Sequence, residues 1–165
     1  MSFIDTRSIS SLYRPVVEML LVDECEFFSA LRCQFASARV LSIREDGYGI
    51  FVDFEVDSHT RILSPKIEYA RVDGLVGIDQ SNRLVCGFAL FIENGAIVQL
   101  DGYPFIGNTW PKEIVELKFI SSDKSGRATY TDHRSSASLS RYILDTPTRM
   151  LYECIEDADD MGDPL

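Results

Sequence analysis

The chain has 165 residues, 45% of them hydrophobic, which is enough apolar content to form a folded core. Its 26 acidic and 16 basic residues give a net charge of −10, which opposes binding to a nucleic-acid backbone. We expect no signal peptide, and no apolar run reaches about eighteen residues, so the sequence predicts a cytoplasmic protein that does not enter a membrane.

The excess of acidic residues is concentrated at the C-terminal end. Residues 150–165 contain six acidic residues and no basic residue, so the rest of the chain has a net charge of about −4. We predict a single domain over residues 1–152 and a flexible acidic tail over residues 153–165. Charge of this sign suits a basic protein partner, although net charge of either sign also serves solubility alone.

Two helices are predicted at the N-terminal end. Pro15 has the placement of a first-turn proline, and a helix over residues 14–22 follows from the spacing of Val16, Met19 and Leu20. Asp23 and Glu26 have the spacing of a capping box that starts a second helix. Four apolar residues recur along one side of this second helix: Phe27, Phe28, Leu31 and Phe35. Such a stripe is typical of a helix that packs on a core.

After residue 36 the apolar period becomes alternating, which predicts strands. Residues 39–44 and 50–57 form a hairpin around Glu45-Asp46-Gly47, with one apolar face and one mostly acidic face. An extended stretch then begins at residue 64, and we expect it to end where Gly74 and Gly77 break the pattern.

A second hairpin is predicted over residues 83–103, where two apolar runs flank Glu93-Asn94-Gly95. The first run is apolar on both faces and predicts a central strand, and the second directs Val98 and Leu100 inward. An ordered loop follows, anchored by Trp110. Two further strands and a helix are predicted over residues 114–120, 128–132 and 136–144. The fold class is therefore α+β, with N-terminal helices packed on an antiparallel β-sheet.

Motifs that carry chemistry are not found. His59 and His133 lie in polar connections without a G-x-S-x-G sequence. The four cysteines are scattered and lack the paired spacing of a zinc site. Gly47-Tyr48-Gly49 lacks the third glycine of a phosphate-binding loop. We therefore expect no enzymatic activity, no metal and no cofactor.

A candidate partner-binding surface remains. In the predicted sheet three carboxylates share one face, and two more lie near it: Asp53, Glu55 and Asp57, then Glu93 and Asp101. Tyr48, Phe51 or Tyr103 is predicted to serve as an aromatic anchor beside them, and Trp110 is also expected to take part in binding. The alternative interpretation is an ordinary solvated sheet face.

A family resemblance rests on Asp-Phe-Glu-Val-Asp at residues 53–57, on the hairpin sequence at residues 86–103 and on Trp110-Pro111. These segments resemble a group of small bacterial proteins with a helical N-terminus and a similar hairpin. Its members resemble the acidic proteins found beside bacterial toxin genes, including immunity proteins of contact-dependent inhibition systems. The resemblance covers residues 16–111 and assigns no catalytic residue.

The function implied by this resemblance is that of an immunity protein, which binds and neutralises a cognate toxin such as a basic nuclease. The alternative is a cytoplasmic interaction or scaffold domain that recruits a different protein through the aromatic loop at residues 102–110. Genomic position separates the two, because an immunity gene directly follows a large secreted toxin gene.

Overall fold

A computed structural model describes residues 9–24, 26–60, 67–107, 109–122, 125 and 127–134. These residues form two helices followed by a seven-stranded antiparallel sheet, which confirms the predicted α+β fold. The predicted helix at residues 136–144 and the acidic tail lie outside the described residues. The elements are α1 (Ile9–Leu20), α2 (Glu26–Ser37), β1 (Arg39–Glu45), β2 (Ile50–Glu55), β3 (Tyr69–Ile78), β4 (Leu84–Glu93), β5 (Ala96–Pro104), β6 (Glu116–Ser122) and β7 (Ala128–Thr131).

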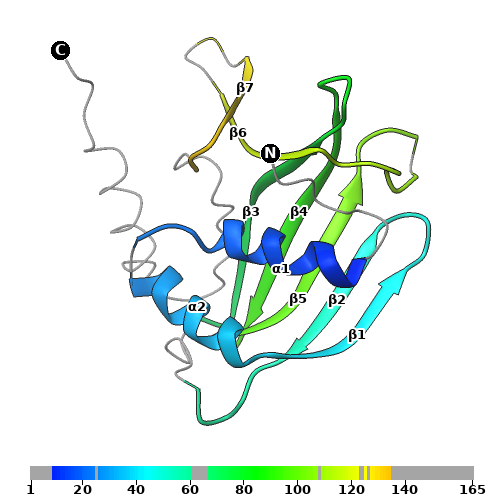
Figure 1. Cartoon of the computed structure of the whole chain (residues 1–165). Helices are drawn as coiled ribbons and strands as arrows, with labels where there is room; N and C mark the ends of the chain where they lie inside the picture. Colours follow the sequence, from blue (N-terminus) through cyan, green and yellow to red (C-terminus); the bar gives the residue numbers. More distant parts are fainter. Residues whose placement is uncertain are drawn as a thin grey trace, which may run out of the picture.

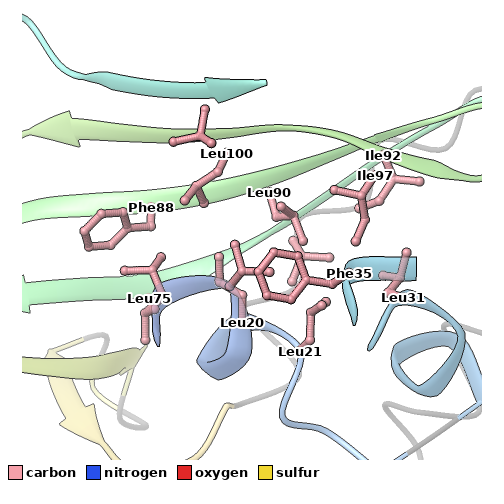
Figure 2. Close-up of a cluster of buried hydrophobic side chains, with 14 of the residues drawn as sticks. Leu20, Leu21, Leu31, Phe35, Leu75, Phe88, Leu90, Ile92, Ile97 and Leu100 are labelled. Carbon is pink, nitrogen blue, oxygen red and sulfur yellow. The ribbon is translucent and has the colours of Figure 1, made fainter. Parts of the chain in front are cut away.

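The strands lie in the order β1-β2-β5-β4-β3-β6-β7, so the predicted second hairpin, β4 and β5, is central. Both helices lie on the same face of this sheet (Figure 1). On that face Leu31 and Phe35 of α2 lie across from apolar side chains of the central strands, including Leu90 and Ile97 (Figure 2). Burying a side chain of this size contributes about 1.5–3 kcal/mol, so this layer is the main source of stability.

Both helix starts differ from the prediction. Helix α1 begins at Ile9 and contains Pro15 in its interior, because the apolar face extends back to the fully buried Leu12. Helix α2 begins at Glu26, three residues after Asp23. The Asp23 carboxylate accepts a hydrogen bond of 3.0 Å from Nε of Arg134.

Arg134 joins the end of the described chain to the helical layer. It is buried, and its guanidinium group lies between the rings of Phe28 and Phe119, 5.2 and 5.1 Å from their centroids. It also donates hydrogen bonds to the carbonyl oxygens of Leu20 and Asp73. One side chain therefore connects the corner between the helices with β3 and β6.

The β4–β5 hairpin turns as predicted, with positive φ at Asn94 (49°) and Gly95 (78°). The predicted side-chain orientation in β5 is wrong at one position. A bulge opposite residues 91 and 92 shifts the register, so Ile97 is buried and Val98 is only half-buried. Gln34 of α2 completes this bulge, because its amide donates to the Gly95 carbonyl at 2.8 Å and accepts from the Ile97 amide at 3.0 Å.

Strand β3 continues through both glycines that were expected to end it. Gly74 has φ of 86° and lies at a bulge between Val72 and Leu75, after which pairing with β4 resumes. At Gly77 an added Cβ would lie 2.6 Å from Sγ of Cys86, so a larger residue cannot be accommodated without a shift. The glycines therefore permit a bent, closely packed strand.

Replacing Gln34 with leucine leaves a buried amide and a buried carbonyl of the central hairpin without partners. We expect the free energy of unfolding to fall by about 2–4 kcal/mol, measured by urea denaturation. The matched control is Gln80→Leu, which removes an exposed hydrogen bond to Glu113 and is expected to change stability by less than about 0.5 kcal/mol. Equal stability of the two variants would contradict the role assigned to Gln34.

Candidate partner-binding surface

The face of the sheet directed away from α1 and α2 is called here the outer face. Directly paired residues of antiparallel strands point to the same face, so the register assigns the residues to it. Phe51 of β2, Asp101 of β5 and Ala89 of β4 form one row across the centre. The next row consists of Asp53, Gln99 and Phe91. The outer face therefore combines carboxylates with aromatic rings, which are half-buried rather than sealed in a core.

Asp53 is already engaged by its neighbours. One carboxylate oxygen accepts a hydrogen bond of 2.6 Å from the Gln99 amide, and the other accepts one from the hydroxyl of Ser42 and lies 3.7 Å from the Arg44 guanidinium group. The Ser42 hydrogen bond is the main cause that lowers the pKa of Asp53. Because both oxygens have partners, Asp53 connects β1, β2 and β5. Its charge is already neutralised in part by these neighbours.

Asp101, unlike Asp53, has a carboxylate oxygen without a hydrogen-bond partner among the described residues. Its Oδ1 atom is buried and accepts no hydrogen bond within the described part of the chain. Desolvation raises the pKa of this carboxyl from 3.8 to about 6, against the attraction of Arg44 and together with the repulsion of Asp53. Its direct neighbours across the strands are Phe51 and Ala89, which supply no polar group from their side chains. Asp101 is therefore a carboxylate whose charge is incompletely neutralised.

Tyr103 lies on the outer face beside Asp101 and is 41% exposed. Its ring lies over Gly87 of β4, where an added Cβ would be 2.6 Å from the ring carbon that carries the hydroxyl. Burial and the nearby Asp73 carboxylate raise the pKa of the Tyr103 hydroxyl, although Arg71 opposes them. Because Gly87 has no side chain, the Tyr103 ring can pack directly on the backbone of β4.

The other predicted acidic residues lie at or just after the ends of their strands. Glu55 forms an exposed ion pair with Arg39 of β1, and Asp57 caps the turn after β2 by accepting a hydrogen bond from the His59 amide. Glu93 is exposed beside the β4–β5 turn. These carboxylates do not form one compact cluster with Asp101.

Trp110 does not join the outer face. It is 8% exposed and belongs to the core, where its ring lies against Phe88 with 6.0 Å between centroids. It anchors its loop as predicted, because its backbone amide donates to the carbonyl of Gly47 at 3.2 Å. Because Trp110 is buried, a binding partner would contact the exposed residues around it instead.

Those residues form an aromatic rim at one end of the sheet, which combines the predicted anchors Tyr48 and Tyr103 with two residues of the aromatic loop predicted at residues 102–110. Residue 50 pairs with residue 102, so the β1–β2 turn lies beside the end of β5. The Tyr103 and Phe105 rings meet edge to face at 5.5 Å. The aromatic rim, with exposed fractions of 71, 41, 45 and 50%, consists of Tyr48, Tyr103, Phe105 and Ile106.

A separate pocket of about 410 Å³ lies next to this rim, between the turn at residues 79–83 and the loop at residues 106–113. Asp79 at its edge is occupied by its own turn, since its carboxylate accepts hydrogen bonds from Arg83 and from the Ser81 amide. These hydrogen bonds, those from Arg83 first, lower the pKa of Asp79. The pocket contains none of the predicted acidic residues.

His59 and His133 are both exposed. Within the described ranges, no three His, Cys, Asp or Glu side chains are placed to hold a metal ion. The helices of the same ranges are too short or too polar to cross a membrane. No protein-family model, curated protein or solved structure matches the chain.

The raised pKa of Asp101 predicts a specific dependence of stability on pH. Folding favours the protonated form of the Asp101 carboxyl, so the free energy of unfolding falls as pH rises from about 4 through 6. An amide at this position does not ionise, so it does not cause this fall. We expect Asp101→Asn to raise the free energy of unfolding by about 1–3 kcal/mol at pH 7.5 and to leave it unchanged below pH 4. Urea denaturation at both pH values tests this. A variant less stable than the wild type at pH 7.5 would contradict it.

Proposed function

We propose that this chain is an immunity protein that binds a basic toxin and neutralises it by occupying its surface. The observation that carries the proposal is the outer face, where half-buried aromatic rings surround an incompletely neutralised carboxylate. Aromatic residues in partly desolvated positions are the usual energetic centres of protein interfaces. Inhibition of this kind requires complementary surfaces and no catalytic group in the inhibitor.

Charge supports a basic partner. The whole chain has a net charge of −10, which attracts a cationic protein over several ångströms and speeds association at low salt. The ion pair of Arg39 with Glu55 is exposed enough to contribute little to folding. Both of its side chains are therefore available to rearrange when a partner docks.

A scaffold domain that recruits another cytoplasmic protein is the second candidate. It is favoured by the loop after β5, where Phe105 and Ile106 are 45 and 50% exposed without any charge beside them in sequence. Such side chains suit an apolar partner whose binding is insensitive to salt. The salt dependence of binding therefore distinguishes the two candidates.

Co-expression provides the direct test. The C-terminal domain of the secreted protein encoded immediately upstream is expressed in a sensitive host with and without this chain. We expect this chain to restore growth and to form a complex that weakens by about tenfold or more between 50 and 500 mM salt. Unchanged toxicity and no complex would reject immunity toward that protein.

Charge reversal locates the docking face. We expect Glu55→Lys combined with Glu93→Lys to slow association with the toxin about tenfold at low salt, with a smaller effect on dissociation. The control is Glu18→Lys combined with Glu24→Lys, which changes the net charge equally at exposed positions of the helical region. Surface plasmon resonance measures both rates. Equal slowing by the two double variants would show that only net charge matters and would exclude the outer face as the docking site.

A further inference from the structure

The outer face contains one acidic group whose position is costly for the isolated protein. Asp101 lies in β5, next to the central strand β4, with paired strands on both sides, and its side chain is half-buried. Its Oδ1 atom is buried and has no hydrogen-bond partner within the described residues. An isolated carboxylate in such surroundings requires a cation or donor to offset its desolvation.

The cations already nearby are committed elsewhere. Arg44 packs over the Phe51 ring at 5.2 Å and forms its ion pair with Asp53 rather than Asp101. The Gln99 amide, next but one along β5, also donates to Asp53. The neutralisation of Asp101 is therefore left to a group from outside these residues.

The surroundings of Asp101 favour a planar cation. On the outer face its neighbours are the rings of Phe51 and Tyr103 and the small side chain of Ala89. A guanidinium group stacks on aromatic rings and bonds a carboxylate with two parallel donors, whereas an ammonium group offers a compact, strongly hydrated charge. The aromatic rim begins at Tyr103 and provides an apolar surface for the residues that flank such a cation.

We propose that Asp101 receives an arginine side chain of the toxin, and that the aromatic rim of Tyr48, Tyr103, Phe105 and Ile106 packs against the residues on either side of that arginine. The proposal rests on the proposed function, because the toxin supplies the arginine. It identifies the residue that must be present on the toxin surface and the position where it binds. It also gives a reason for a carboxylate at a position where an amide would stabilise the free protein.

The test uses a defined probe, the peptide acetyl-Ala-Leu-Arg-Leu-Ala-amide, and its twin with citrulline in place of arginine. The twins have the same shape and differ in charge. Carboxylate and aromatic ring signals of the full chain are followed by NMR during titration with each peptide. We expect saturable shifts of the Asp101 carboxylate and the Tyr103 ring with the arginine peptide, and about tenfold weaker binding of the citrulline peptide.

Two variants complete the test. Asp101→Asn, which is expected to be at least as stable as the wild type, should weaken binding of the arginine peptide about tenfold, while Glu18→Gln, at an exposed position of α1, should change it less than twofold. Equal binding of the two peptides, equal binding to Asp101→Asn, or shifts that avoid Asp101 would overturn the proposal. Failure of this chain to suppress toxicity would reject the proposed function and leave the peptide result standing, so the two failures are distinguishable.

Discussion

Burial on one side of the sheet is the constraint on which the rest of the structure depends. Helices α1 and α2 are twelve residues each and carry their apolar side chains to a single face of the central strands. The central strand β4 is nevertheless buried along most of its length on both faces. Its second face is covered by long side chains of adjacent strands lying along the sheet, such as Tyr103 over Gly87. The outer face is therefore assembled from side chains that are half-buried.

This arrangement separates two carboxylates that look equivalent in the sequence. Asp53 has hydrogen-bond partners for both oxygens and connects three strands, whereas Asp101 has a buried oxygen without a partner. A polar group that contributes to folding needs its hydrogen bonds satisfied, and one that is left unsatisfied costs stability. Positions at which a sequence gives up stability are often the positions that function requires. Asp101 gives up stability in this way, whereas Asp53 does not.

The sequence predicted the elements better than the contacts between them. Alternating apolar residues and Asn94-Gly95 located the central hairpin, because strand period and turn chemistry are local properties. The bulge that buries Ile97 instead of Val98 depends on Gln34, which lies about sixty residues away, and no local pattern predicts it. The glycines of β3 were misread as an end for the same reason, since the close approach of Cys86 is visible only in three dimensions.

The candidate surface was predicted in part. Alternation along β2 correctly placed Asp53 and Glu55 on the face away from the core, but the ion pairs with β1 depend on strand register. Trp110 was expected to contact a partner and is buried, because its loop folds over the end of the core and attaches to the β1–β2 turn. Phe105 and Ile106, in the same loop, are the exposed apolar residues instead.

Hydrogen exchange of this chain, free and in complex with the toxin domain, tests the central claim most directly, because it maps the contact without any substitution. Amides in short turns and loops exchange quickly until a partner covers them. The account predicts slower exchange in the β1–β2 turn at residues 46–49 and in the loop at residues 105–107, with α1 and α2 unchanged. Protection confined to the two helices would contradict the assignment of the outer face and its aromatic rim as the binding surface.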